Sequence, residues 1–193
     1  MGDLTRRATL AASAGLPWAT AQAVADDGGS PLPSASRILV AYFTRSGNTK
    51  VIAGTVQRDL KADLFEIRPA QSYPEDYEET VAQAQRETER RYEPPLAATV
   101  PNIAAYDTVF LGLPIWGMTA PPVIRAFLRT HDLRGKTVRP LITHSGYGLG
   151  DSMAVIRAHA PGTTVAEPFA LEADQERRTL NQVRGWLGTI KPG

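Results

Sequence analysis

The chain has 193 residues, of which 42% are hydrophobic and 21% charged, a composition typical of one globular domain with a two-sided core. Lysine and arginine total 21 and aspartate and glutamate total 20, so the formal net charge is +1. This balance gives no basic surplus for nucleic acid and no acidic surplus for docking onto a basic partner. Cysteine is absent from the sequence, which excludes disulfides, iron–sulfur clusters and thiolate zinc sites.

Residues 1–25 have the features of an export signal. Arg6-Arg7 precedes an Ala-rich, mildly apolar stretch that ends in the small-residue pattern Ala23-Val24-Ala25. We expect cleavage after Ala25, because the stretch is too short and too interrupted to remain as a membrane span. The paired arginines resemble the twin-arginine motif, although Thr9 stands where that motif usually has Phe, and an ordinary secretory signal is the alternative. The mature protein is therefore expected in the periplasm, without an integral membrane anchor.

Residues 26–36 are polar and rich in Gly and Pro, which predicts a flexible linker before a domain that spans residues 37–193. The domain opens with a continuous apolar run at residues 38–43, the pattern of a strand buried on both faces. After a polar turn, Ile52, Val56 and Leu60 recur every four residues. They predict a helix to about residue 62 with that face packed on a sheet.

The same alternation continues along the chain. Further strands are expected at residues 64–67, 108–113, 137–143 and within 163–171, although Pro140 makes the fourth strand the weakest of the five. A surface helix is expected at residues 75–91, and another helix is expected to begin at Pro121-Pro122. Two more are indicated by the apolar sets Leu149, Met153, Ile156, Ala160 and Leu180, Val183, Leu187. Repeated strand–helix units predict an α/β fold with a doubly wound parallel sheet.

The first turn carries three hydroxyl groups around a glycine. Thr44, Ser46 and Thr49 flank Gly47 at the start of a helix, where free backbone N–H groups and hydroxyls can converge on a phosphate dianion. An N-capping turn would need only one such hydroxyl. Because three of them surround a glycine directly after a buried strand, phosphate binding is the favoured interpretation.

This strand followed by Thr-x-Ser-Gly-x-Thr resembles the FMN phosphate loop of the flavodoxin family. Residues 114–118, Pro-Ile-Trp-Gly-Met, and residues 143–150, Thr-His-Ser-Gly-Tyr-Gly-Leu-Gly, resemble the short-chain flavodoxin-like branch of that family. Residues 73–77 fit the same branch, so the resemblance covers nearly all of residues 37–190. It implies a five-stranded parallel sheet in the order 2-1-3-4-5 with helices on both faces, and FMN at the carboxyl ends of the strands.

The resemblance also implies which residues contact the cofactor. The first loop would hold the phosphate, Trp116 would lie against the isoalloxazine, and the third loop would line the other edge of the ring. Tyr147 is either a second stacking residue or an exposed loop aromatic. The implied cofactor-binding set is Thr44, Arg45, Ser46, Gly47, Asn48, Thr49, Pro114, Ile115, Trp116, Gly117, Met118, Ser145, Gly146, Tyr147, Gly148 and Gly150.

Three functions are compatible with these patterns. The first is a one-electron carrier that exchanges electrons with a redox partner protein or a small-molecule acceptor. The second is an FMN-dependent reductase that takes hydride from NAD(P)H and passes it to a quinone, although no motif indicates a nicotinamide pocket. The third is a periplasmic binding module without flavin, against which the phosphate loop and Trp116 argue. The three scattered histidines, His131, His144 and His159, do not indicate a metal site.

Overall fold

The structure is a computed structural model that describes residues 37–172 and 176–189. The predicted export signal, residues 1–25, and the predicted linker, residues 26–36, lie outside the described residues. Within the part that is described, no helix combines the length and the apolar character needed to cross a membrane.

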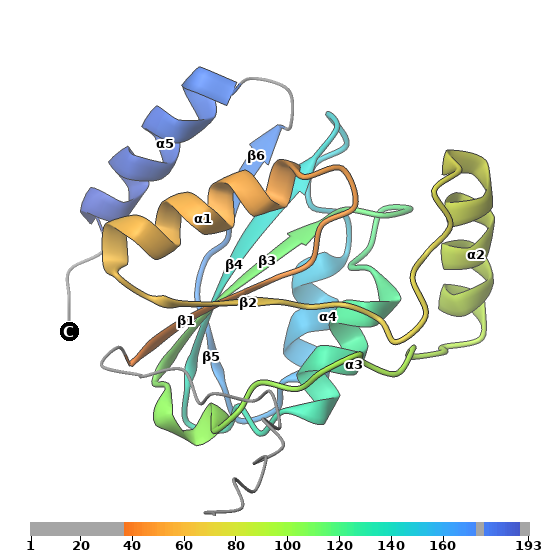
Figure 1. The fold of residues 1–193 in the computed structure, drawn as a ribbon, viewed down its shortest axis with the longest axis horizontal. Coiled ribbons are helices and arrows are strands. Elements are labelled where there is room, and N and C mark those ends of the chain that lie inside the picture. Colours follow the sequence, from red (N-terminus) through yellow and green to blue (C-terminus); the bar gives the residue numbers. More distant parts are fainter. Residues whose placement is uncertain (1–36, 173–175, 190–193) are drawn as a thin grey trace, which may run out of the picture. The chain divides into compact units, whose positions relative to one another are not determined.

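A parallel sheet with the strand order β2-β1-β3-β4-β5 forms the centre of the domain (Figure 1). Every strand pairing in it is parallel. The fifth position is shared by β5 and β6, which pair with successive parts of β4. The predicted order 2-1-3-4-5 is therefore confirmed, with a divided last strand. The strands are β1 (Ile38–Tyr42), β2 (Asp63–Glu66), β3 (Thr108–Pro114), β4 (Thr137–His144), β5 (Thr164–Val165) and β6 (Phe169–Glu172).

Helices cover both faces of the sheet, as expected for a doubly wound fold. α1 (Asn48–Leu60) and α5 (Glu176–Thr189) lie together on one face, and α3 (Pro122–Thr130) and α4 (Ser152–His159) lie on the other (Figure 1). α2 (Tyr77–Glu89) is the predicted surface helix and buries only Thr80, Ala84 and Glu87. A short 3-10 helix, Ile103–Ala105, was not anticipated from the sequence.

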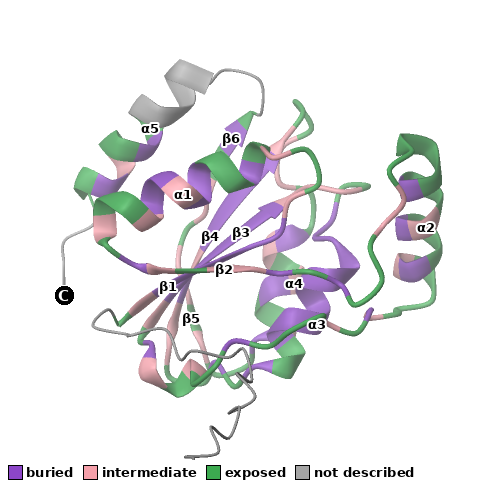
Figure 2. Ribbon diagram, in the orientation of Figure 1, coloured by how far each residue is buried: buried purple, intermediate pink, exposed green. Residues whose placement is uncertain are grey.

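The two faces of the sheet bury separate apolar cores, and Figure 2 shows the central strands as almost wholly buried. Along β1, Leu39 and Ala41 belong to the core shared with α3 and α4, whereas Val40 and Tyr42 belong to the core shared with α1 and α5. Successive side chains of a strand point to opposite faces, and these four are at most 2% exposed. This two-sided burial explains why the strand reads as a continuous apolar run.

The last two helices differ slightly from the sequence prediction. Leu149 precedes α4, which begins at Ser152, although Leu149 still packs against the core. In α5, Val183 and Leu187 are buried as predicted, and the side chain of Leu180 lies outside the described part.

Pro140 lies inside β4, paired in register with Leu111 of β3. The Ala166 N–H donates to the Val138 carbonyl, so the backbone polar groups of Val138 point toward the edge strand. Pro140 is two residues later in the same strand, so its backbone groups point the same way. That edge strand is interrupted between β5 and β6, beside Pro140. The missing N–H of Pro140 therefore falls where no ladder partner is in place, which is how this strand accommodates a proline.

Gly112 offers a test of how closely α1 packs on the sheet. A Cβ atom at Gly112 would lie 2.8 Å from Tyr42 Cβ and 3.1 Å from Thr49 Cγ2. We expect Gly112→Ala to lower the free energy of unfolding by about 1–3 kcal/mol through overpacking, measured by urea denaturation.

Gly54 provides the matched control. It lies within α1, and a Cβ atom there would meet only the end of the flexible Arg58 side chain, at 3.2 Å. Gly54→Ala should raise the free energy of unfolding by about 0.5–1 kcal/mol, because alanine is the better helix former. Equal responses of the two variants would contradict the packing argument.

Candidate cofactor site

Three of the predicted loops meet at the carboxyl edge of the sheet. They follow β1, β3 and β4, which are neighbours in the strand order. The chain leaves β1 for a helix on one face and leaves β3 for a helix on the other, so the edge above β1 and β3 is the topological switch point (Figure 1). Ligands of doubly wound sheets bind in the crevice at that point.

The loop after β1 is closed by a hydroxyl group. Gly47 is the N-cap of α1 and has a φ of 92°, a left-handed conformation that glycine adopts without strain. Its N–H donates to Thr44 Oγ1 at 3.0 Å. The Thr44 hydroxyl, predicted as a phosphate contact, therefore closes the turn within this structure.

The first turn of α1 is not capped by any side chain among the described residues. The first helical hydrogen bond runs from the Val51 N–H to the Gly47 carbonyl at 3.2 Å. The N–H groups of Asn48, Thr49 and Lys50 consequently have no acceptor within the helix. Together with the positive end of the helix dipole, they form a site suited to an anion.

Helix α2 of the same protein begins in a different way. Asp76 accepts a hydrogen bond from the Glu79 N–H at 2.9 Å, and Glu78 and Glu79 lie in the first turn. The Asp76 carboxylate accepts a free backbone N–H, and the charges of Glu78 and Glu79 oppose the positive end of the helix dipole. The start of α1 has neither, so it is open to a ligand from outside the chain.

The remaining side chains of the first loop have separate roles. The Thr49 hydroxyl is 1% exposed and hydrogen-bonds the Thr143 hydroxyl of β4 at 2.9 Å, which ties α1 to the sheet. Ser46 is exposed and has no hydrogen bond with any described residue. Arg45 donates to the Glu75 carbonyl at 2.6 Å and lies over the Tyr77 ring. Of the three predicted hydroxyls, that of Ser46 has no described partner, and that of Thr44 accepts from the Gly47 N–H but keeps its own O–H to donate to a phosphate.

The loop after β3 is a tight hairpin. The Trp116 N–H donates to the Thr119 carbonyl at 3.0 Å, and the Thr119 N–H donates back to the Trp116 carbonyl at 3.1 Å. The two central residues, Gly117 and Met118, both have positive φ, 55° and 67°. These values identify a type I′ turn, in which Met118 adopts a conformation that disfavours residues with a side chain.

Two aromatic rings hold the Trp116 indole in place. The ring centroids of Trp116 and Tyr73 are 4.9 Å apart at an interplanar angle of 81°, and those of Trp116 and Phe43 are 5.2 Å apart at 76°. Both contacts are edge-to-face, which is a favourable geometry for aromatic pairs. Trp116 is half-buried, so it is neither a fully buried core residue nor a freely exposed side chain.

A cavity of about 690 Å³ adjoins this aromatic cluster. It includes the predicted cofactor residues Thr44, Arg45 and Trp116, but none of the third loop. The cavity therefore lies on the β1 and β2 side of Trp116. Its lining residues are Phe43, Thr44, Arg45, Glu66, Ile67, Arg68, Pro69, Ala70, Ser72, Tyr73, Pro74, Glu75, Ala97 and Trp116.

The loop after β4 is exposed and shaped by glycines. Gly146, Gly148 and Gly150 all have positive φ, and the Gly146 N–H donates to His144 Nδ1 at 3.2 Å. Tyr147 is 74% exposed, so its ring is accessible from solvent.

Gly150 joins this loop to the hairpin. The Asp151 N–H donates to the Met118 carbonyl at 2.9 Å, and a Cβ atom at Gly150 would lie 1.8 Å from the same carbonyl oxygen. Only glycine permits this approach, so two loops that are far apart in the sequence form one unit.

Several residues that shape the site were not in the predicted set. Tyr73 supports Trp116, Thr143 anchors α1, and Asp151 binds the hairpin. The Tyr-Pro pattern at residues 73–74 indicated the family branch but not a contact with Trp116. Pro114 and Ile115 lie at the end of β3 and beyond it, partly buried, and Ser145 is exposed at the start of the third loop.

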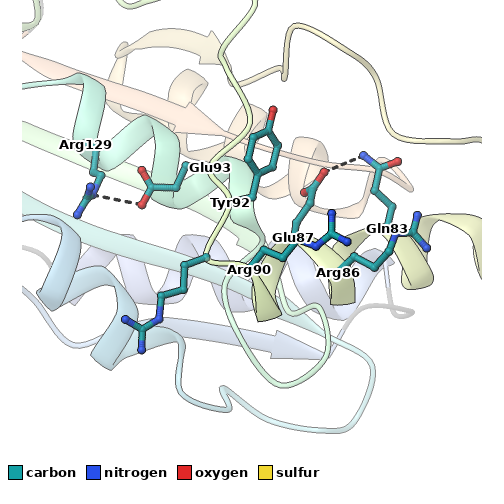
Figure 3. Close-up of a pocket in the computed structure, with 8 residues that line it drawn as sticks. Gln83, Arg86, Glu87, Arg90, Tyr92, Glu93 and Arg129 are labelled. Atoms are coloured by element: carbon teal, nitrogen blue, oxygen red, sulfur yellow. Dashed lines mark hydrogen bonds and ion pairs between the residues drawn. The ribbon is translucent and has the colours of Figure 1, made fainter.

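A second cavity, of about 580 Å³, lies against α2 and contains none of the predicted cofactor residues (Figure 3). Arg129 pairs with Glu93 at its rim, 3.2 Å apart. Glu87 is buried and accepts hydrogen bonds from Gln83 Nε2 and from the Tyr73 hydroxyl, each at 2.8 Å. Burial and the Glu87 hydrogen bond raise the pKa of the Tyr73 phenol, which therefore stays protonated as the donor.

Solved structures with the same fold come from several bacteria. A Bacteroides eggerthii protein assigned as a flavoprotein is 34% identical, with a TM-score of 0.68, covering 79% of this chain and 96% of that chain. A second one, from Bacteroides uniformis, is 27% identical, with a TM-score of 0.69 and coverage of 79% and 97%. A Lactobacillus acidophilus flavoprotein, solved in complex with FMN, is 21% identical, with a TM-score of 0.63 and coverage of 76% and 99%.

Comparison with curated proteins gives no significant match. The family model for flavodoxin matches residues 37–190, which is most of the chain and includes all three loops described above. The chain therefore belongs to the flavodoxin family.

Proposed function

We propose that this protein holds FMN at the carboxyl edge of its sheet and carries electrons through that cofactor. FMN is the cofactor of the flavodoxin family to which the chain belongs. The observation that carries the proposal is the uncapped start of α1, next to Ser46 and directly at the switch point of the sheet. An anionic group completes that helix start, as a phosphate would.

The residues present fit the rest of FMN as well as its phosphate. Trp116 offers an indole fixed by Tyr73 and Phe43, which suits stacking against a flat apolar ring. The loop of residues 145–150 is exposed or half-buried, and at Gly148 it offers a backbone N–H without an intervening side chain, which suits the polar edge of such a ring. When bound, FMN supplies reversible electron transfer, and the chain orients it and shields it from water.

The hairpin after β3 contributes a peptide that can reverse its direction. Flavodoxin carriers commonly present a backbone carbonyl to the flavin after such a rearrangement. Here a reversal of the Gly117–Met118 peptide would convert the type I′ turn to type II′, which prefers glycine at its first central position. Met118 would then return to a negative φ, so the reversal relieves the unfavourable conformation of Met118 and the turn is suited to switching.

A second candidate function is a two-electron reductase for a small-molecule acceptor. The cavity of about 690 Å³ beside Trp116 favours it, because it is large enough for a small aromatic ligand. The electron source would be NAD(P)H. Steady-state oxidation of NAD(P)H with a quinone as acceptor distinguishes this function from simple electron carriage.

We also propose that residues 1–25 direct the protein out of the cytoplasm. Support comes from Arg6-Arg7 and the Ala-rich stretch that follows, and from the family match, which begins only at residue 37. A chain that folds around FMN in the cytoplasm needs a route that carries folded cargo. For this reason we favour the twin-arginine route and a periplasmic site of action.

Gly150 tests the proposed FMN site. Gly150→Ala should weaken FMN binding by about tenfold or more, because its Cβ atom displaces the Met118 carbonyl and separates the two loops. Quenching of FMN fluorescence on titration with purified protein measures the effect. Gly135→Ala is the control, since Gly135 also has a positive φ, a Cβ atom there would meet no atom within 4 Å apart from its chain neighbours, and it precedes β4 at the end away from the site. Equal losses in both variants would refute the proposed link between the loops.

Gly117 tests electron carriage. Val is disfavoured at the positive φ of this turn, so Gly117→Val should restrict the peptide reversal and narrow the separation between the two one-electron midpoint potentials. An anaerobic reductive titration followed by visible absorbance measures both potentials, with Met118→Gly as the variant that keeps the turn mobile. Unchanged potentials in Gly117→Val would exclude a role for the peptide. Single-step reduction of the native protein would favour the two-electron reductase.

The export proposal is tested with residues 1–36 fused to a reporter protein that folds before transport. Replacing Arg6 and Arg7 with lysine preserves the charge but removes the paired arginines. We expect the reporter to stay in the cytoplasm after this change, as judged by cell fractionation. Continued export of the double variant would instead indicate an ordinary secretory signal.

A further inference from the structure

Arg125 is a buried arginine on α3 without an acidic partner. The residue is 8% exposed, and no carboxylate of the described residues forms an ion pair with it. Its Nη2 atom donates to Thr119 Oγ1 at 3.3 Å, and its Nε atom is buried without any hydrogen-bond partner. The arginines that do form ion pairs have exposed side chains, so the environment of Arg125 differs from theirs.

A buried charge without a counter-charge is unfavourable for the folded chain. Removal of a guanidinium from water costs free energy that only an opposite charge or full hydrogen bonding recovers. An apolar side chain of similar length, such as methionine, would fill the same space without that cost. A negative charge that arises nearby in another state of the protein would offset this cost.

Arg125 lies next to the hairpin that follows β3. Thr119, the residue it contacts, is paired through both backbone groups with Trp116. Arg125 thus lies at the base of the hairpin that carries Trp116, Gly117 and Met118. The proposed phosphate site is at the start of α1, after strand β1, whereas Arg125 lies on α3, after strand β3. We therefore expect its partner elsewhere on the cofactor.

A second orphaned group lies beside the same hairpin. Among the described residues, the buried side-chain polar atoms without a partner are Arg125 Nε and Ser152 Oγ. Ser152 is fully buried and follows Asp151, whose N–H donates to the Met118 carbonyl. Arg125 thus contacts the hairpin directly, and Ser152 follows the residue whose N–H binds it, so two buried polar atoms near this hairpin lack partners.

We propose that Arg125 is the counter-charge for FMN in its fully reduced, anionic form. The inference rests on the proposed function, and it assigns to Arg125 a role in setting the potential of the cofactor. On full reduction FMN takes up two electrons and one proton from outside the protein, and so ends with one more negative charge than the oxidised form. A fixed positive charge in a water-poor environment favours the form with the extra negative charge.

The test compares the affinities of the protein for oxidised and fully reduced FMN. Arg125→Gln removes the charge and should weaken binding of reduced FMN about tenfold more than binding of oxidised FMN. For a two-electron couple, that ratio corresponds to a potential lower by about 30 mV. Arg125→Lys keeps the charge and should retain most of the native potential. The potentials are measured anaerobically with dithionite as the electron donor and reference dyes.

Arg129→Gln is the matched control. Arg129 lies one turn later on α3 and is exposed, where it pairs with Glu93 (Figure 3). This variant loses the same charge from the same helix, but solvent and salt screen the effect of an exposed group. Its potential should equal that of the native protein.

Thermal unfolding of the FMN-free protein separates an electrostatic role from a structural one. If Arg125 mainly braced the hairpin through Thr119, neutral variants would have a lower Tm and an unchanged potential. The proposal instead expects the Tm of Arg125→Gln to be at least that of the native apoprotein, with the potential lowered. Arg125→Met is the second neutral variant, should the glutamine variant not fold.

The outcomes also separate the inference from the function on which it rests. Normal FMN binding by the native protein, with equal potentials in Arg125→Gln and Arg129→Gln, would overturn the role of Arg125 alone. Failure of the native protein to bind FMN would overturn the proposed function and this inference together. A lower potential confined to the neutral Arg125 variants would support both.

Discussion

The hydrogen bond between the Asp151 N–H and the Met118 carbonyl holds the carboxyl edge of this domain together. The hairpin after β3 and the glycine loop after β4 are otherwise separate excursions of the chain. The bond makes them one surface, and it forms only because Gly150 has no Cβ atom in the way. The orientation of the hairpin, and with it the position of Trp116, depends on this contact between two backbones.

A second set of contacts positions Trp116 from the opposite side. Tyr73 meets the indole edge-to-face, and its hydroxyl donates to the buried Glu87 carboxylate on α2. The surface helix α2 is thereby connected to the ring that would face the cofactor, although no residue of α2 lies in the predicted cofactor set. The site is thus supported by a surface helix as well as by the loops that form it.

The sequence was sufficient for the fold, and the three loops it singled out follow strands that are neighbours in the sheet. The apolar run at residues 38–43 correctly predicted β1, because a strand buried on both faces has apolar residues at every position. The apolar residues of α1 correctly predicted that helix, because they recur at helical spacing. Pro140 shows the limit of such rules. Its presence in β4 depends on an interruption in the neighbouring strand, which is a tertiary feature.

The individual contacts of the site were less predictable for the same reason. The motif at residues 44–49 does not reveal that Thr44 closes the turn and that Thr49 is buried against Thr143, 94 residues away. Neither the pairing of Tyr73 with Trp116 nor the isolation of Arg125 has any local signal. Both depend on which helices the fold brings together.

The uncapped start of α1 also links the stability of the protein to the supply of its ligand. A ligand that binds only the folded chain stabilises it by an amount that grows with its concentration, about 2.7 kcal/mol at 100 times the dissociation constant. A typical domain has a total stability of only about 5–15 kcal/mol. Chains that have not acquired an anionic ligand at this helix would therefore unfold more often, and proteases would remove them first. The open helix end thus makes the stability of the folded chain depend on whether the anionic ligand is bound.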